Sequence, residues 1–136
     1  MKHIPLIVVL AGVLGASTAA ESQPRGPYGW ILPATQAAGR QVFEEHCAAC
    51  HSPRSGTPYG PSLVGVVGRR AGSVAGFPYS EALKTSGLVW TDDNLLKWIA
   101  NNTQMVPGTL MPHPSITDPV EKAYLVAYLK TLKPPS

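Results

Sequence analysis

Cysteine is scarce in this sequence of 136 residues, which contains only Cys47 and Cys50. A pair so close together cannot form the disulfide framework of a small secreted domain. Charge is sparse as well, because charged residues make up 14% of the chain and the formal net charge is +3. No dense basic patch typical of nucleic-acid-binding proteins is present, so we expect no nucleic-acid partner.

The apolar run at residues 4–15 is too short for a membrane span, because its 12 residues fall below the ~20 that a transmembrane helix needs. Lys2 precedes the run and small residues follow it, which is the pattern of a secretory signal peptide. We therefore predict a signal peptide at residues 1–20, cleaved near Ala19 or Ala20. The mature protein would then be periplasmic and would have no membrane span.

Helical patterns occur in four segments of residues 35–136, and none of these residues shows the alternation typical of a strand. The first segment begins at Thr35, and a short second one covers residues 80–85. Thr91 and Asp118 are N-cap candidates for the third and fourth. The sequence therefore predicts one all-α domain of about four helices.

Two irregular stretches, residues 52–77 and 101–114, separate these helices. Loops of such length normally count against the assignment of a compact domain. The objection disappears if a large apolar cofactor forms the core around which the loops wrap. Residues 21–34, which are rich in Pro and Gly, are predicted to form an extended arm before the domain.

Both cysteines belong to the run Cys47-Ala48-Ala49-Cys50-His51, the C-x-x-C-H signature of covalent haem attachment. If the run is helical, the two thiols share one face and can reach the two vinyl groups of one porphyrin. The imidazole of His51 then stands where it can ligate the iron. The run predicts one haem c, bound through Cys47 and Cys50, with His51 as an axial ligand.

A redox-active dithiol and a zinc site are the alternatives for this motif. The dithiol is typical of a βαβ setting, and the sequence shows no alternation of strands and helices. Structural zinc takes four ligands, and the chain has no second pair of cysteines. A zinc site would have to recruit His46, His51 and His113.

Further motifs accompany the C-x-x-C-H run in a fixed order. They are Gly39 and Phe43, Gly60-Pro61-Ser62-Leu63, Gly68-Arg69, Gly76-Phe77-Pro78-Tyr79-Ser80, Leu88-Val89-Trp90, Pro107-Gly108-Thr109-x-Met111 and Leu125-Val126-Ala127-Tyr128-Leu129-Lys130. With these motifs the chain resembles class I cytochrome c, the short soluble type with one haem, from about Thr35 to Leu132. The resemblance implies the cytochrome c fold.

The resemblance also implies roles for single residues. Met111, rather than Met105, would be the second axial ligand, since methionine is paired with histidine in cytochromes c. The carbonyl of Pro61 would accept a hydrogen bond from His51 and fix its tautomer. Three further residues would neutralise or hydrogen-bond the haem propionates, namely Arg69, Tyr79 and Trp90.

An iron whose two axial positions are both filled leaves no place for a substrate. The resemblance therefore implies a periplasmic one-electron carrier that is monomeric and is not an enzyme. Its partners would be redox proteins such as a dehydrogenase, a cytochrome complex or a terminal oxidase. One alternative is a dedicated haem subunit of a dehydrogenase or oxidase complex, and another is a ligand-binding or peroxidase-like haem protein in which Met111 is displaced.

The chain departs from the family pattern around Met111. Trp98 stands where a tyrosine usually approaches the methionine sulfur, and Leu83 stands where an asparagine often helps to hold a buried water. Both changes predict a drier methionine side. Residues 101–117 contain no charged residue, although the resemblance leads one to expect several lysines. We therefore predict an uncharged docking face around Met111, with His113 in the place of a common aromatic residue.

Overall fold

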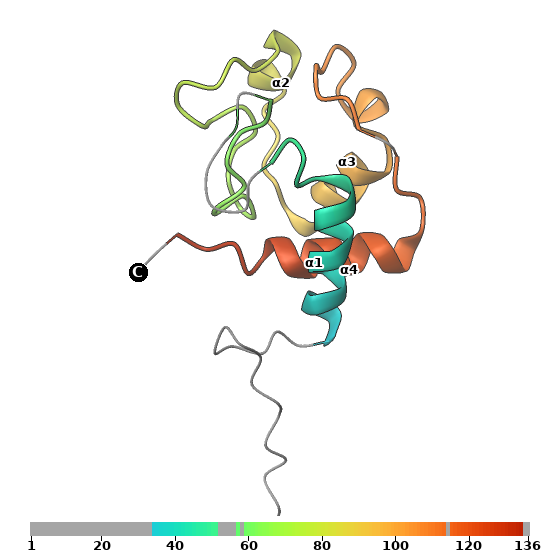
Figure 1. Cartoon of the computed structure of the whole chain (residues 1–136). Coiled ribbons are helices and arrows are strands. Elements are labelled where there is room, and N and C mark those ends of the chain that lie inside the picture. The colour runs from blue at the N-terminus through green and yellow to red at the C-terminus, as the bar shows by residue number, and fades with distance from the viewer. Residues whose placement is uncertain (1–33, 52–56, 58, 114, 135–136) are drawn as a thin grey trace, which may run out of the picture. The chain divides into compact units, whose positions relative to one another are not determined.

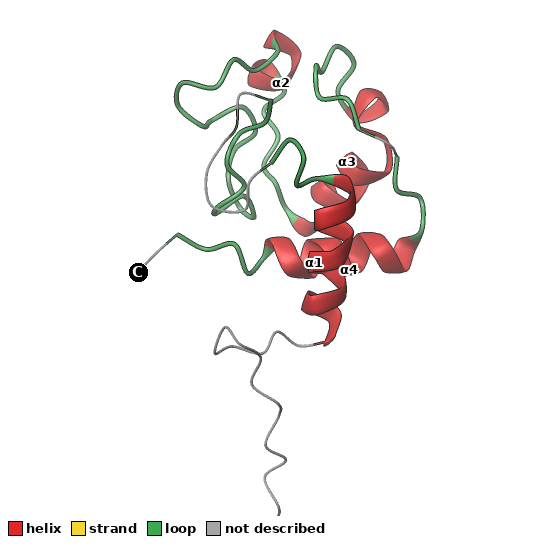
Figure 2. Cartoon of the chain, viewed as in Figure 1, coloured by secondary structure: helices red, strands yellow, loops and turns green. Residues whose placement is uncertain are grey.

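The computed structural model describes residues 34–51, 57, 59–113 and 115–134. The predicted signal peptide and all of the predicted arm except Ala34 lie outside the described residues. The described residues form four helices, α1 (Ala34–His46), α2 (Glu81–Thr85), α3 (Asp92–Met105) and α4 (Pro119–Leu129). Long loops join them (Figures 1 and 2). The described residues contain no strand, only an isolated bridge between Arg70 and Val89. The all-α prediction is therefore confirmed.

Side-chain caps define where three of the helices begin. The hydroxyl of Ser80 accepts a hydrogen bond from the Leu83 N–H before α2, and that of Thr91 accepts one from the Asn94 N–H before α3. The carboxylate of Asp118 accepts two backbone N–H groups at the start of α4. Such caps satisfy amides that have no partner within the helix, so the sequence itself fixes these starting points.

The helix α3 is longer than the sequence analysis predicted. Residues 101–105 were expected to be irregular, but they are helical and follow a kink at Asn101, whose φ and ψ are −162° and 91°. The side-chain oxygen of Asn101 accepts the Gln104 N–H at 3.0 Å. Asn101 therefore interrupts the helix and caps the segment that restarts after it. At the other end of the chain, α1 begins at Ala34, one residue before the predicted Thr35.

α1 packs closely across α4 (Figure 1). Gly39 permits the close approach, since a Cβ at this position would collide with the carbonyl oxygen of Tyr124. The rings of Phe43 and Tyr128 meet beside it with centroids 5.3 Å apart. Phe43 and Leu125 are the largest side chains that are fully buried. The crossing fixes the end of α1, from which the cysteine motif continues.

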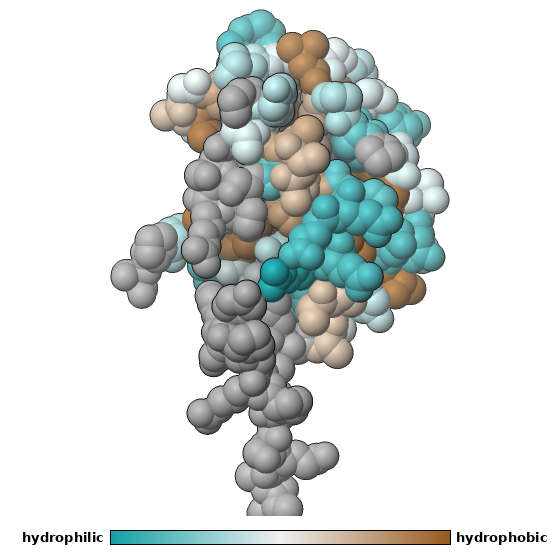
Figure 3. Space-filling view, viewed as in Figure 1, coloured by the Kyte–Doolittle hydropathy of each residue, from teal (hydrophilic) through white to brown (hydrophobic). Residues whose placement is uncertain are grey.

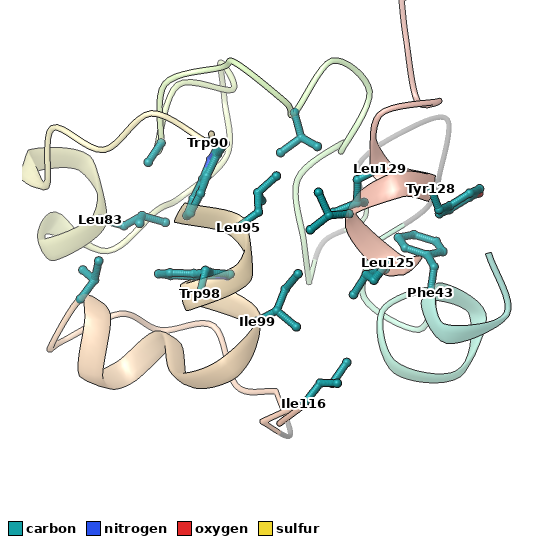
Figure 4. Packing of buried hydrophobic residues seen from close by; sticks show 14 residues of the cluster. Phe43, Leu83, Trp90, Leu95, Trp98, Ile99, Ile116, Leu125, Tyr128 and Leu129 are labelled. Atoms are coloured by element: carbon teal, nitrogen blue, oxygen red, sulfur yellow. The ribbon is translucent and has the colours of Figure 1, made fainter. Parts of the chain in front are cut away.

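The other part of the core lies between α3 and the loops before it. Trp90 and Trp98 make an edge contact with ring centroids 5.0 Å apart, and Leu95 lies close to them (Figure 4). The backbone of Trp90 is paired with Gly68 and Arg69 through two hydrogen bonds of 2.9 Å. The irregular chain is thus held by backbone pairing and by large apolar side chains.

The face that α1 presents in Figure 3 carries mainly hydrophilic residues, with smaller hydrophobic areas around it. An exposed ion pair between Arg40 and Glu44, with an N–O distance of 2.8 Å, lies on this helix. Such exposed pairs contribute little to stability. Of the helices described, none has the length and apolar character that a membrane crossing requires.

Candidate haem site

The cysteine motif continues α1 by one further turn. The N–H of Cys47 donates to the Phe43 carbonyl at 2.8 Å, and the N–H of His51 donates to the Cys47 carbonyl at 2.8 Å. Cys47 and Cys50 are free thiols. Because the backbone keeps turning through the motif, both thiols and the His51 ring face the same cavity.

This cavity is partly open to solvent. The lining comes from the end of α1, the loop after it, α3, the loop before α4 and α4 itself. The residues are His46, Cys47, Cys50, His51, Tyr59, Trp98, Ile99, Met111, Pro112, His113, Ile116 and Leu125.

His51 is held on one side of the cavity in a form suited to metal binding. It is 5% exposed, and its Nδ1 lies 2.9 Å from the carbonyl oxygen of Pro61. Burial lowers the pKa of the imidazole, the hydrogen bond to Pro61 opposes this, and the charge of His113 lowers it further. A neutral ring that donates from Nδ1 to Pro61 leaves the Nε2 lone pair available, which is the form that a metal binds.

Gly60 packs tightly against the His51 ring. A Cβ at this position would lie 2.6 Å from the Cys50 carbonyl oxygen and 2.7 Å from Cε1 of His51. Only glycine therefore allows the Gly60-Pro61 segment to lie against the imidazole. The same segment supplies the carbonyl that His51 contacts.

The thiol of Cys47 does not resemble the reactive thiol of a redox-active dithiol. Burial, with a smaller effect from Cys50, raises the pKa of Cys47 to about 11. Reactive dithiols have lowered pKa values instead, because the thiolate is the attacking species. Within the described part of the chain, no three His, Cys, Asp or Glu side chains form a group that could hold a metal ion, as the zinc alternative would need.

Met111 lines the same cavity from the loop that follows α3. Its backbone carbonyl accepts a hydrogen bond from Nδ2 of Asn102 at 2.6 Å. Met105 packs against the hydrophobic core but is not among the residues that line this cavity. The structure therefore brings Met111, and not Met105, together with the cysteine motif.

Comparison with known proteins agrees with this geometry. The family model for cytochrome c matches residues 36–133. The chain belongs to the cytochrome c family. It is 47% identical to cytochrome c2 of Rhodopila globiformis over 96 residues, which cover 70% of this chain and 91% of that protein. It is 41% identical to cytochrome c of Euglena viridis over 96 residues, with 70% and 94% covered. The solved structure of cytochrome cH from Methylobacterium extorquens matches with a TM-score of 0.67 and 44% identity, and the match covers 71% of this chain and 97% of that one.

As a cytochrome c, the protein is an electron carrier with one haem c attached through Cys47 and Cys50, and it is not an enzyme. The cavity fits this cofactor in three respects. Two free thiols are three residues apart, a neutral imidazole is oriented by a backbone carbonyl, and most of the remaining lining is apolar.

The other predicted site residues lie outside the cavity lining, except for Trp98. Arg69 donates from its two terminal nitrogens to the carbonyls of Ser62 and Val64, each at 2.8 Å. The pKa of Tyr79 is raised by burial, while the Val74 backbone and the charge of Arg69 lower it. Trp90 contacts Trp98 and is paired with the backbone of Arg69. Arg69 therefore connects Tyr79 and Trp90, and Trp90 in turn contacts Trp98 of the cavity lining.

Two polar residues of this cytochrome c, Thr109 and Asn102, are given no role by the sequence analysis. In the described residues, only Nε of Arg69 and the hydroxyl of Thr109 are buried side-chain atoms without a hydrogen-bond partner. Buried polar atoms are nearly always paired, so each of these needs an explanation. The only sequence signal for Thr109 is its place in the Pro-Gly-Thr-x-Met motif. Asn102 carries no such signal, because its contact with Met111 exists only in the folded chain.

Proposed function

We propose that this protein is a periplasmic one-electron carrier in which His51 and Met111 are the axial ligands of the haem iron. The haem, when bound, supplies the electron couple between Fe(III) and Fe(II). The observation that carries the proposal is that Cys47, Cys50, His51 and Met111 line one cavity. The chain provides the two covalent links, the two ligands and the apolar surroundings.

The two proposed ligands differ in how the chain orients them. The Pro61 carbonyl keeps a proton on Nδ1 of His51, so Nε2 would be the nitrogen available to bind the iron. Met111 offers a soft thioether, which is a common partner of histidine in cytochromes c. With both positions filled by the protein, no substrate binds the metal, and the role of the chain is to set the potential and allow electron exchange.

Arg69, Tyr79 and Trp90 are proposed to stabilise the haem propionates. The unpaired Nε of Arg69 supports this role, since a carboxylate would satisfy it and would offset the cost of burying the guanidinium. We add the hydroxyl of Thr109, which is also buried and unpaired. Trp98 is proposed to cover the haem beside Met111.

Export to the periplasm rests on the sequence of residues 1–20, which has the pattern of a signal peptide. The proposal predicts that the mature protein lacks the 4–15 segment, which mass spectrometry of the purified protein would test.

The partners are proposed to be redox proteins that dock without strong charge pairing. Residues 101–117 contain no charged side chain. Two large side chains with apolar surface are highly exposed, Tyr59 at 79% and Leu110 at 76%. Tyr59 lines the cavity, and Leu110 directly precedes Met111. A partner with a matching uncharged patch would suit this face, whether a dehydrogenase, a cytochrome complex or a terminal oxidase.

A dedicated haem subunit of a dehydrogenase or oxidase complex is the second candidate. The same uncharged rim and the exposure of Leu110 favour it, since apolar contact surfaces are typical of stable complexes. Size-exclusion chromatography of the native protein from its own periplasm separates the two. A free carrier elutes as a monomer, whereas a subunit elutes together with a large partner.

A redox titration of the exported holoprotein, followed by its visible spectrum, tests the proposed function. We expect one reversible one-electron step, and no binding of carbon monoxide to the reduced protein. Met111→Ala should open the iron to carbon monoxide, whereas the matched variant Met105→Ala should behave like the wild type. Carbon monoxide binding by the wild type, or equal effects of the two variants, would refute the ligation.

A further inference from the structure

Asn102 is an unusual residue for the interior of this protein. Among the described residues, it and His51 are the only buried polar or charged side chains, and Asn102 is 4% exposed. Burial of an amide is costly unless the group is hydrogen-bonded. The Asn102 side chain donates to the Met111 carbonyl at 2.6 Å. A buried polar group with such a specific partner indicates a role in fixing that partner.

The kink at Asn101 explains why Asn102 can reach the methionine loop. Asn101 leaves the helical conformation, so Asn102 begins the restarted segment of α3. The carbonyl of Asn102 accepts the Val106 N–H at 2.8 Å, while its side chain holds Met111. One residue therefore holds both ends of the segment from Val106 to Met111.

Two further hydrogen bonds attach the chain after Met111 to α3. His113 Nε2 lies 3.3 Å from the carbonyl oxygen of Trp98. The N–H of Ile116 donates to the Ile99 carbonyl at 3.1 Å. The methionine loop is thus attached to consecutive turns of α3, and the contact through Asn102 is the one made at Met111 itself.

We propose that Asn102 is a positioning residue that keeps the Met111 thioether in the cavity by holding its backbone carbonyl. The proposal rests on the proposed ligation by Met111. Without the amide donor, the Met111 carbonyl loses its partner and the ligand-bound loop becomes less stable relative to a displaced loop. An external ligand then competes more easily for the same coordination position, since its apparent affinity rises with the fraction of displaced loop.

Imidazole binding to the ferric holoprotein is the experiment that tests this role. Asn102→Leu keeps a similar volume and removes the donor, and Asn102→Ala serves as a second variant that introduces no larger side chain. Loss of a buried hydrogen bond predicts that imidazole binds about tenfold more tightly to these variants. The methionine-to-iron absorption band of the ferric protein should weaken in parallel.

Asn94 provides the matched control on the same helix. Its side chain also donates to a backbone carbonyl, that of Val89, at 2.8 Å, but it is only partly buried and its partner lies before α3 and not in the methionine loop. Asn94→Leu and Asn94→Ala should leave imidazole affinity within about twofold of the wild type, because they remove a similar bond elsewhere. The comparison separates positioning of Met111 from a general loss of stability.

Two results would overturn the inference, and they are distinguishable. Asn102 variants with the imidazole affinity and methionine band of the wild type would overturn this inference alone. A wild type that lacks the methionine band would overturn the proposed ligation, and the role of Asn102 with it.

Discussion

The histidine side and the methionine side of the cavity are built in different ways. His51 lies next to the cysteines that anchor the haem, is 5% exposed, and contacts a carbonyl ten residues further along the chain. Met111 comes from a distant loop, is half-buried, and is held through Asn102 of α3. The first side is therefore fixed by neighbouring residues, and the second depends on contacts between distant segments.

The difference indicates where the site is rigid and where it can open. Displacing His51 would require the turn after α1 and the Gly60-Pro61 segment to move together. Displacing Met111 requires only that its loop separate from α3. Segments with few tertiary contacts open at lower free energies than core helices, so we expect the methionine side to be the first to yield.

The largest expected effect is on the histidine side, from Gly60→Ala. The added Cβ overlaps the Cys50 carbonyl and the His51 ring, and such overpacking costs about 3 kcal/mol. Urea unfolding of the holoprotein measures this change. Gly76→Ala is the control, since Gly76 has a φ of +77° but open space around it, and there we expect only about 1–2 kcal/mol. Equal costs at the two positions would contradict the close fit around His51.

A smaller effect is expected on the methionine side from Asn101→Ala. Loss of this internal cap costs about 1 kcal/mol and destabilises the segment of α3 that holds the loop. We expect the methionine-to-iron absorption band of this variant to disappear at a lower urea concentration than that of the wild type. The urea concentration at which the remainder of the protein unfolds should change little. Thr91→Ala removes the cap at the start of the same helix and should not affect the band selectively. If both variants lower the urea concentration for loss of the band equally, the two halves of α3 do not unfold independently.

A pH-dependent effect is expected where the histidine side is supported by the α1–α4 crossing. Burial raises the pKa of Tyr128 above its ordinary value. The folded protein therefore keeps this proton while the unfolded chain loses it above about pH 10, so stability falls as the pH rises. Tyr128→Phe should lose less stability than the wild type between neutral and alkaline pH, as measured by urea unfolding. Tyr59→Phe, at an exposed position, should lose as much as the wild type.

The smallest effect is expected from salt. The rim around Met111 is uncharged from residue 101 to 117, whereas α1 carries exposed charges such as Arg40 and Glu44. Electrostatic steering requires complementary charge near the contact, so the rate of electron transfer should change less than about threefold across physiological and high salt. Stopped-flow mixing with the physiological partner measures it, and a steep fall in rate with salt would contradict docking at this rim.

The histidine side could be predicted from the sequence because its parts are adjacent. The five consecutive residues 47–51 indicate both the covalent attachment of the haem and the axial histidine. Gly60-Pro61, which contacts that histidine, follows them closely in the sequence. The caps Thr91 and Asp118 were equally accessible, since a cap acts on amides two or three residues away. Met111 was identified only through the resemblance to a family, because a single methionine in a loop carries no signal of its own.

The contacts that hold Met111 could not be predicted in this way. The sequence predicts irregular chain from residue 101 onward, and asparagine favours turns as well as helix caps, so its identity alone does not reveal the restart of α3. The Asn101 side chain instead restarts α3 and brings Asn102 to the loop. The lack of a hydrogen-bond partner at Arg69 Nε and at the Thr109 hydroxyl could not be predicted either, since whether a polar group is paired depends on the whole fold.

The absorption spectrum of the ferric holoprotein, recorded for the wild type and for Met111→Ala, tests the central claim most directly. We expect a covalently bound haem in both proteins, a methionine-to-iron band in the wild type, and no such band in the variant. A colourless exported protein, or a variant that keeps the band, would contradict ligation of the haem between His51 and Met111.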